Sequence, residues 1–364
     1  MRIGVDASNI RTGGGKKHLE KFINKSLRQF KEVRFVLVSN SIVNRSFKDQ
    51  ERVECITNFF LNTNSFFSLI SQLFYSNKYF KSKKCDIVFV PGGIFLSSFQ
   101  PYVVMSQNML PFDKEERNRF GFKMKMKILF IQLFQKYTFK RSQGVVFLTD
   151  YAKNTIIEQI GSVKSSVVIP HGIEQQLRNK YSQDTNNFQI LYISDFLPYK
   201  HQYNVVKSVI DLIKEGFDIN LTLIGNTDTY QHNLIKELLE KNKSIATKIK
   251  ILGQLDFNMV KDYLNNSSLF LFASTCENLP FIVLEAISYG LPVITTDKSP
   301  MNQIVAGQNI FFDSLDIKSI KNIIKDNLNE EKLNKISELN YLNSKNYKWK
   351  TNVIQTIKYL KSIA

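Results

Sequence analysis

The sequence is poor in cysteine and has no long uncharged apolar run. Its three cysteines, Cys55, Cys85 and Cys276, lie far apart and form no CxxC pair. That pattern is typical of reduced structural thiols rather than of disulfides or zinc ligands. No segment reaches the roughly 20 uncharged apolar residues that a membrane-spanning helix needs. Residues 1–6 read directly as a strand and not as a signal peptide, so we expect a cytoplasmic protein.

Metal-ligating patterns are also missing. No Asp-x-Asp sequence occurs anywhere in the chain. The four histidines have no spacing typical of a metal site, and they are His18, His171, His201 and His232. We therefore predict no metal site.

Acidic residues are scarce in the first half of the chain. The net charge of the 364 residues is +17, and residues 1–170 hold 27 Lys and Arg against 12 Asp and Glu. A half of the chain with this excess of positive charge could bind nucleic acid, an anionic membrane leaflet or a phosphorylated acceptor. No helix-turn-helix, zinc-finger or RNA-binding pattern accompanies it, so we do not expect nucleic acid as a partner.

The most basic run, residues 114–141, mixes cations with large aromatic side chains. These residues include Lys123, Lys125, Lys127, Arg141, Phe120, Phe122, Phe130 and Phe134. Such a mixture suits a helix lying at a lipid interface, which would hold the protein on the inner face of the plasma membrane. An ordinary core helix with a basic outer face explains the run equally well, and both interpretations stay open.

Short strand-like runs alternate with helical segments in two series. The strand-like runs are 2–6, 33–38, 86–90, 102–105, 144–148 and 166–169, and then 189–193, 220–224, 249–252, 269–272 and 292–295. The helical segments are 18–30, 123–141, 203–215, 231–241, 259–265 and 281–288. This alternation predicts an α/β protein made of two doubly wound, Rossmann-like domains. Residues 174–188, rich in Gln, Asn and Ser, read as the linker.

A glycine-rich loop follows the opening strand. Gly13, Gly14 and Gly15 allow close backbone approach, and a helix predicted to begin near Lys16 would point its amides at the loop. A phosphate group would be stabilised there. The loop is neither GxGxxG nor GxxxxGK[ST], so a dinucleotide enzyme or an NTPase is poorly supported. A flexible turn is the plainer alternative.

The most specific signal is the block 277–294, ENLPFIVLEAISYGLPVI. Glu277 lies in a loop after a predicted strand and can accept hydrogen bonds from sugar hydroxyls. Glu285 lies on the following helix and can hold the two hydroxyls of a ribose. The positive end of that helix suits a diphosphate, and the residues there are Asn278, Leu279, Pro280 and Phe281. Either glutamate alone would read as an ordinary helix charge.

This block resembles the donor site of retaining GT-B glycosyltransferases of family four. The resemblance rests on two glutamates eight positions apart within E-N-L-P-F-x-x-x-E-A-x-x-x-G-x-P-V-I. Other segments are similar to that family in the expected order, and they are 106–112 (SQNMLPF), 168–173 (VIPHGI) and 189–200 (QILYISDFLPYK). With the opening glycine-rich loop, they match the group that builds bacterial surface polysaccharides.

The resemblance implies a GT-B fold, two Rossmann-like domains facing across a cleft. Residues 1–173 would bind the acceptor, and residues 174–346 would bind the nucleotide sugar. The C-terminal helix, residues 347–364, would pack back on the first domain.

The resemblance also implies roles for single residues. Glu277 and Lys200 would serve catalysis, Glu277 on the transferred sugar and Lys200 on the departing diphosphate. Glu285 would bind the ribose, and residues 13–15 would lie against the phosphate. The resemblance implies no covalent nucleophile. The acceptor would attack from the front face, and catalysis would rest on charge stabilisation and positioning. The reaction would need neither metal nor cofactor, because the nucleotide sugar is a co-substrate.

Two positions depart from the family pattern. Asp195 stands where many relatives have an arginine for the phosphates, so either another basic residue such as Arg11 or Lys16 helps, or phosphate binding is weaker. Gln107 and Asn108 stand where many relatives have a histidine that touches the donor sugar. We take Gln107, Asn108 and Arg11 as candidate contacts to the sugar or the acceptor, because an amide donates and accepts hydrogen bonds.

The predicted function is retaining transfer of a hexose from a nucleotide diphosphate sugar to a glycan or lipid-linked oligosaccharide, in surface polysaccharide (O-antigen or capsule) biosynthesis. A GDP- or UDP-sugar is expected, with mannose as the first guess. A nucleotide-sugar epimerase on the same architecture is one alternative, although no second carboxylate pair supports it. The other is an inactive, basic scaffold that binds membrane or anionic glycan.

Overall fold

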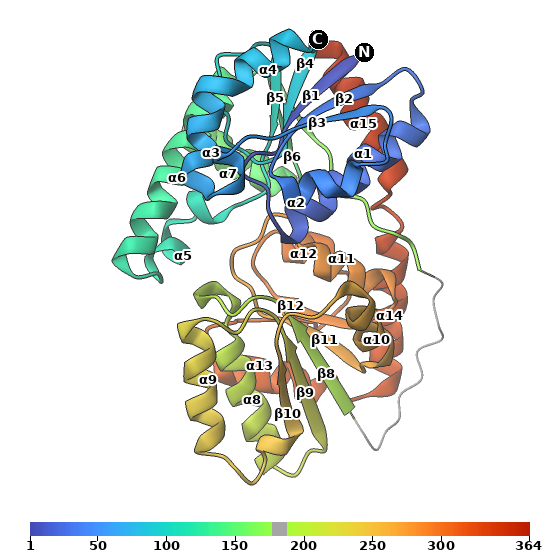
Figure 1. Cartoon of the computed structure of the whole chain (residues 1–364). Coiled ribbons are helices and arrows are strands. Elements are labelled where there is room, and N and C mark those ends of the chain that lie inside the picture. Colours follow the sequence, from blue (N-terminus) through green and yellow to red (C-terminus); the bar gives the residue numbers. More distant parts are fainter. Residues whose placement is uncertain (177–187) are drawn as a thin grey trace. The chain divides into compact units, whose positions relative to one another are not determined.

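The computed structural model describes residues 1–176 and 188–364, and the chain divides into two compact units (Figure 1). The first unit comprises Met1–Arg117, Gly121–Gly172 and Tyr347–Ala364. The second comprises Asn118–Phe120 and Ile173–Asn346. Most of the predicted linker 174–188 lies outside the described residues.

The first unit contains a seven-stranded parallel sheet in the order β3-β2-β1-β4-β5-β6-β7. Its strands are β1 (Arg2–Asp6), β2 (Arg34–Val38), β3 (Val53–Ile56), β4 (Ile87–Val90), β5 (Tyr102–Met105), β6 (Gly144–Phe147) and β7 (Ser166–Val168). Strands β4, β5 and β6 are buried along their whole length, as expected for a parallel sheet covered on both faces.

Helices and short turns connect these strands. They are α1 (Gly13–Gln29), α2 (Ser41–Asn44), η1 (Arg45–Phe47), η2 (Phe60–Asn62), α3 (Ser65–Ser71), η3 (Gln72–Ser76), α4 (Asn77–Ser82), η4 (Leu110–Phe112), α5 (Lys114–Asn118), α6 (Phe122–Arg141), α7 (Asp150–Ile160) and α15 (Trp349–Ile363). The C-terminal helix α15 packs against α1 and belongs to the first unit. There Asn352 donates a hydrogen bond to the Pro170 carbonyl at 2.6 Å.

The second unit contains a six-stranded parallel sheet in the order β10-β9-β8-β11-β12-β13. Its strands are β8 (Phe188–Ile193), β9 (Ile219–Ile224), β10 (Ile249–Leu252), β11 (Leu269–Phe272), β12 (Val293–Thr296) and β13 (Phe311–Phe312). Its helices and turns are η5 (Pro198–Lys200), α8 (Gln202–Lys214), α9 (Tyr230–Glu240), η6 (Ala246–Lys248), α10 (Phe257–Asn266), α11 (Phe281–Ser288), α12 (Met301–Ile304), α13 (Ile317–Asp326) and α14 (Glu330–Ser344).

In both sheets the order in which successive strands are added reverses beside the first strand. β1 lies between β2 and β4, and β8 lies between β9 and β11. At such a switch point the loops after the two central strands diverge, and ligands bind outside the carboxyl ends of those strands. The fold therefore directs attention to the loops after β1 and β4 in one unit and after β8 and β11 in the other.

The predicted α/β fold of two doubly wound sheets is confirmed, with one local correction. Gly13, Gly14 and Gly15 were expected in a loop before a helix starting near Lys16, but α1 begins at Gly13. Thr12, in an extended conformation, is the N-cap residue that precedes the helix. The three glycines thus contribute the unpaired amides of the first helical turn themselves.

Candidate active site

Lys200 lies at the switch point of the second unit. It ends the short turn η5 that follows β8, and its side chain is almost entirely buried. Its ammonium nitrogen lies 5.1 Å from the ring centre of Tyr199 and 5.0 Å from that of Phe272. Both distances are within the range of a cation–π contact, so the two rings stabilise the charged end.

Glu277 reaches the same point from the loop after β11. It forms an ion pair and hydrogen bond with Lys200, and the exposed fractions of the two side chains are only 12% and 11%. Because β8 and β11 are neighbours in the sheet, residues 77 positions apart meet at this edge. The structure thus brings together the two residues predicted to serve catalysis.

A second layer of contacts ties the two loops together. The Thr275 amide donates to the Tyr199 carbonyl at 2.9 Å, and the His201 ring lies 2.9 Å from the Thr275 hydroxyl. Burial lowers the pKa of His201 to about 4, so this imidazole is neutral at pH 7. Burial, and then the charge of Glu277, raise the pKa of Tyr199 well above its ordinary value. Thr275 was not anticipated from the sequence, because a threonine near a strand end carries no signal of its own.

Asp195, the departure from the family pattern, has a local structural partner. Its carboxylate accepts a hydrogen bond from the Asn226 amide at 3.1 Å. The Gln202 side chain donates to the Asp195 carbonyl at 2.9 Å. Asp195 therefore joins the loop after β8 to the loop after β9.

The remaining predicted donor-binding residues lie at the beginning of α11. The helix starts at Phe281 with Pro280 as its N-cap, and no side chain caps it. Glu285 lies four residues into the helix and is buried. Asn278 and Leu279, in the preceding loop, are also buried. The first turn of α11 contains no acidic residue, which leaves its positive end suited to an anion.

A pocket of about 290 Å³ lies at the switch point of the first unit. Its lining residues come from the loops after β1, β4 and β5, from the first turn of α1 and from α6. They are Asn9, Ile10, Arg11, Thr12, Gly15, Pro91, Gly92, Gln107, Asn108 and Gln135. Of the residues predicted to touch phosphate, sugar or acceptor, Arg11, Gly15, Gln107 and Asn108 meet here. Gly13 and Gly14 do not line the pocket.

Several polar atoms of this pocket are buried without a partner in the described residues. They are Asn9 Oδ1, Gln135 Oε1 and Arg11 Nε. Buried groups of this kind are rare in folded proteins, and a polar ligand would satisfy them. Asn9 is positioned by a hydrogen bond from its Nδ2 to the Gly92 carbonyl at 2.9 Å. A Cβ atom at position 92 would lie 1.8 Å from Asn9 Oδ1, so any larger residue would displace the Asn9 side chain.

Comparison with known proteins gives a family match for the second unit. Residues 173–347 match the family model described as glycosyl transferases group 1. This chain carries a glycosyl transferases group 1 domain. The resemblance drawn from the glutamate block is therefore confirmed. The matched segment contains Lys200, Glu277 and Glu285.

Curated relatives are similar to this chain over part of their length. The capsular polysaccharide biosynthesis glycosyltransferase CapH of Staphylococcus aureus is 28% identical over 243 residues, which are 62% of this chain and 64% of CapH. The match to CapM of the same organism is 26% identical and covers 43% of this chain and 41% of CapM. This chain thus spans less than two thirds of the length of the curated relatives that it matches.

Solved structures share the fold over the whole chain. Sucrose-phosphate synthase from Thermosynechococcus elongatus gives a TM-score of 0.80 at 12% identity, over 100% of this chain and 98% of that one. Anabaena Alr3699/HepE, in complex with UDP and glucose, gives 0.73 at 18% identity, over 100% of both chains. At such identities the likeness shows the fold alone, and that fold is GT-B.

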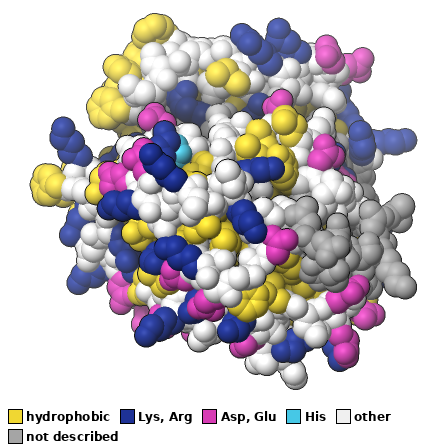
Figure 2. All heavy atoms as spheres, turned by 90° about the horizontal axis from the view of Figure 1, so that it is seen from below, with side chains coloured by type: hydrophobic (Ala, Val, Ile, Leu, Met, Phe, Trp, Pro, Cys, Tyr) yellow, Lys and Arg dark blue, Asp and Glu magenta, His cyan; other side chains and the backbone are white. Residues whose placement is uncertain are grey.

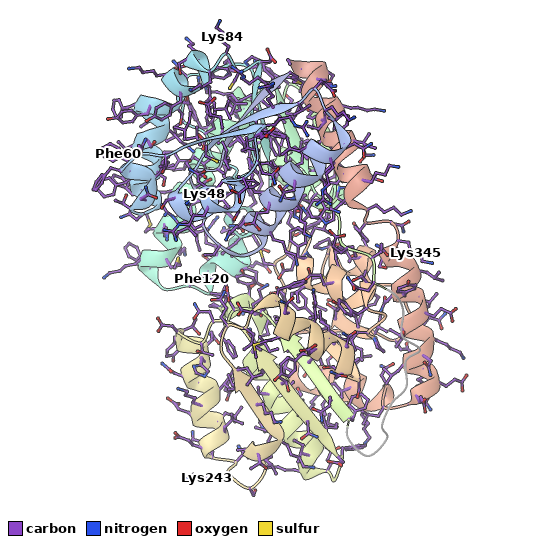
Figure 3. The ribbon with its side chains drawn as sticks, turned by 45° about the vertical axis from the view of Figure 1, so that its right-hand side comes forward. Lys48, Phe60, Lys84, Phe120, Lys243 and Lys345 are labelled. Atoms are coloured by element: carbon purple, nitrogen blue, oxygen red, sulfur yellow. The ribbon has the colours of Figure 1, made fainter. Side chains whose placement is uncertain are left out.

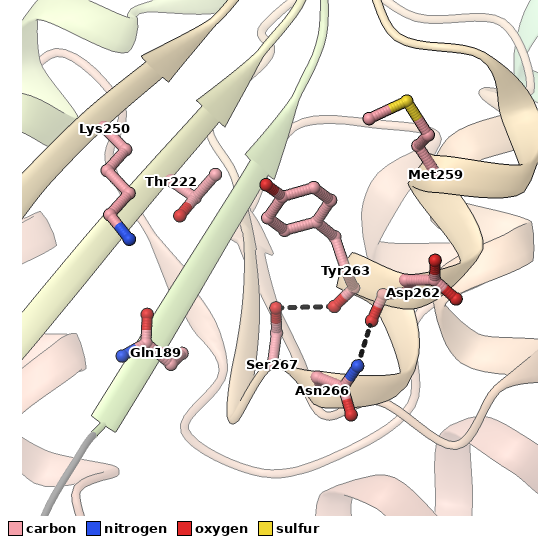
Figure 4. Close-up of a pocket in the computed structure, with 8 residues that line it drawn as sticks. All are labelled: Gln189, Thr222, Lys250, Met259, Asp262, Tyr263, Asn266 and Ser267. Atoms are coloured by element: carbon pink, nitrogen blue, oxygen red, sulfur yellow. Dashed lines mark hydrogen bonds between the residues drawn. The ribbon is translucent and has the colours of Figure 1, made fainter.

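Another pocket of the group 1 domain, of about 410 Å³, lies away from this candidate site (Figure 4). Gln189 and Lys250, near the beginnings of β8 and β10, line it together with residues of α10. Those are the strand ends opposite to Lys200, and no predicted site residue lines this pocket.

The described residues contain neither a metal-binding cluster nor a membrane-spanning helix. In residues 1–176 and 188–364, no cluster of three or more His, Cys, Asp or Glu side chains is arranged to hold a metal ion. None of the helices in those ranges is long and apolar enough to cross a membrane.

Proposed function

We propose that this protein is a glycosyltransferase that uses a nucleotide diphosphate sugar, with the donor bound by its second unit. The observation that supports this most is the buried Lys200–Glu277 pair at the β8–β11 switch point. A cation there can neutralise a diphosphate, and the uncapped beginning of α11 adds backbone amides.

In the proposed reaction, Lys200 leaves its pairing with Glu277 to neutralise the departing diphosphate. Glu277, released from the lysine, accepts hydrogen bonds from hydroxyls of the transferred sugar, and Glu285 holds the ribose. His201, neutral at pH 7, keeps the two loops in register and does not supply a proton. The acceptor hydroxyl attacks from the face that the diphosphate leaves, the bond from the sugar to the diphosphate breaks, and the departing diphosphate takes up the hydroxyl proton. Configuration is thus retained without metal ion or cofactor.

The donor is proposed to be a UDP- or GDP-hexose. The HepE structure in complex with UDP and glucose favours UDP as the first nucleotide to test. A mannose-type sugar is the alternative that would accompany GDP. The names of the relatives CapH and CapM favour a role in capsular or other surface polysaccharide biosynthesis.

The first unit is proposed to bind the acceptor, a glycan or lipid-linked oligosaccharide. The polar pocket with Asn9, Gln135 and Arg11 supports this, because its unpartnered oxygens can accept hydrogen bonds from sugar hydroxyls. We propose a cytoplasmic location, peripheral to the inner face of the membrane.

A thermal-shift panel tests the donor site. UDP, GDP, ADP, dTDP and CMP are added to the wild type, to Glu285→Ala and to the control Glu338→Ala, which alters an exposed glutamate on α14. One diphosphate should raise Tm for the wild type and the control but not for Glu285→Ala, because ligand binding to the folded state stabilises it.

No shift with any nucleotide would contradict a working donor site. It would favour the basic scaffold, which should also tolerate Glu277→Ala without loss of function. Interconversion of the free nucleotide sugar without an acceptor would instead favour an epimerase.

A further inference from the structure

Helix α6 of the first unit turns an apolar face to solvent. Its outward stripe, spaced by three or four residues and therefore on one side of the helix, consists of Phe122, Met126, Phe130, Leu133 and Tyr137. Phe122 exposes 78% of its surface. The inward face is buried through Ile128, Gln135 and Phe139. An ordinary surface helix has its polar residues outward, so this apolar stripe requires a covering partner.

A second exposed apolar group lies on η2, α3 and η3. Its aromatic cluster consists of Phe59, Phe60, Phe66, Phe67 and Tyr75, with ring centres of neighbouring pairs about 6 Å apart. Phe59 exposes 75% of its surface, and Phe60 lies at the outer edge of the unit in Figure 3. The aromatic cluster is therefore a preformed surface feature and not part of the core.

The apolar stripe and the aromatic cluster belong to the same side of the first sheet. Gln72 of η3 exchanges hydrogen bonds with the backbone of Ile94 and Leu96, and Thr138 of α6 accepts one from the Phe95 amide. The two elements thus flank one short backbone segment, and Figure 1 shows α3 and α6 on one side of the unit. In Figure 2, hydrophobic side chains protrude beside Lys and Arg at the left edge of the face shown.

The chain segments that carry the two groups contain charged residues of a single sign. Residues 55–85 and 121–149 contain no Asp or Glu, but they contain four and six Lys and Arg. Lys123 and Lys127, both exposed, flank the apolar stripe. The first unit as a whole has 30 Lys and Arg against 12 Asp and Glu, whereas the second has 19 against 20. The whole net charge of the chain therefore lies on the unit that carries the apolar surface.

We propose that the apolar stripe and the aromatic cluster dock the first unit on an anionic lipid bilayer. Exposed aromatic and aliphatic side chains enter the interface, and the flanking lysines pair with anionic headgroups. A second copy of the chain fits less well, because a symmetric contact would bring two positive surfaces together. Of the two interpretations of residues 114–141, a helix at a lipid interface and a core helix with a basic outer face, the proposal favours the lipid interface.

The same two helices reach the candidate acceptor pocket from their inner faces. Gln135 of α6 lines it, and Ser68 of α3 accepts a hydrogen bond from Arg11 at 3.0 Å. Docking would bring this pocket to the membrane surface where a lipid-linked acceptor resides, an inference that rests on the proposed function. The docking itself does not depend on transfer activity.

Co-sedimentation of the full chain with vesicles tests the proposal. The vesicles contain phosphatidylcholine with phosphatidylglycerol, or phosphatidylcholine alone. The wild type should sediment only with the anionic vesicles, and added NaCl should weaken binding. Lys123→Gln/Lys127→Gln should lower the partition coefficient roughly 30-fold. Phe122→Ser/Phe130→Ser should lower it at least about tenfold.

Matched controls lie on the second unit. Tyr230→Ser/Phe257→Ser removes exposed aromatic residues there, and Lys241→Gln/Lys243→Gln removes exposed lysines. Both should bind vesicles like the wild type. Equal loss in controls and test variants, or equal binding to both vesicle types, would overturn the proposal.

Two more measurements distinguish lipid docking from self-association and from a failed donor site. If the wild type is a dimer in solution and does not bind vesicles, and Phe122→Ser/Phe130→Ser is a monomer, then a second copy covers the stripe and the proposal is wrong. The nucleotide thermal shift should be unchanged in the stripe variants. Absence of that shift in the wild type, with vesicle binding intact, would reject the proposed transferase and leave the docking standing.

Discussion

At the scale of single residues, the Lys200–Glu277 pair shows what a local motif can and cannot reveal. The glutamate block and the lysine were both recognisable from sequence. Their direct pairing was not, because it depends on β8 and β11 becoming neighbours. A buried ion pair contributes little net stability in itself, yet the loss of one partner leaves a buried charge. The pair therefore links activity and stability in one measurable contact.

Replacing Lys200 by Met should lower turnover with the preferred donor by about 10²–10³-fold, because the cation that stabilises the leaving group is lost. It should also destabilise the fold by about 3 kcal/mol, since Glu277 remains buried without its partner. Adding Glu277→Gln should restore stability but not turnover. Turnover assays and urea denaturation measure the two effects. Wild-type turnover in Lys200→Met would make the lysine purely structural.

At the scale of secondary structure, the sequence predicted all but two of the strands. Every predicted strand agrees with the structure to within one residue at each end. The two missed strands, β3 and β13, are both edge strands. β3 includes the exposed Glu54, and β13 has two residues. The other two edge strands, β7 and β10, were predicted, so edge position alone does not explain the omissions. The charged Glu54 within β3 and the short length of β13 do.

The docking of α15 on the first unit depends on a position without a side chain. A Cβ atom at Gly172 would lie 2.4 Å from the backbone N and Cα of Trp349, where α15 begins. Gly172→Ala should therefore destabilise the protein by about 3 kcal/mol, because backbone cannot rotate away as a side chain can. Gly253→Ala, which meets no atom within 4 Å, is the matched control. Equal midpoints of urea unfolding for the two variants would show that α15 shifts without cost.

At the scale of the whole molecule, the sequence predicted two α/β units and the excess of positive charge in the first. It did not predict the pocket that contains Asn9 and Gln135, which come from positions 126 apart and belong to no contiguous motif. The apolar stripe was visible only as a mixture of Phe and Lys, because exposure cannot be read from composition. Long-range juxtaposition and exposure are the two properties that required the three-dimensional structure.

Folding stability as a whole should depend on pH through a buried histidine. His18 on α1 is fully buried, and its ring centre lies 4.7 Å from that of His171 and 5.6 Å from that of Trp349. Burial lowers the pKa of His18 to about 3, against 6.5 in the unfolded chain. Below pH 6.5 the unfolded chain therefore binds a proton that the folded chain does not. Stability must fall as pH decreases through this range.

Between about pH 7.5 and about pH 5, His18 should account for a loss of about 2 kcal/mol in the free energy of unfolding. His18→Leu should remove that share of the pH dependence, whatever its effect on stability at a single pH. Part of the dependence should persist, because burial also lowers the pKa of His171 well below its ordinary value. Urea unfolding of both proteins at the two pH values measures the difference. An unchanged pH dependence in His18→Leu would mean that His18 is hydrated or protonated in the folded protein.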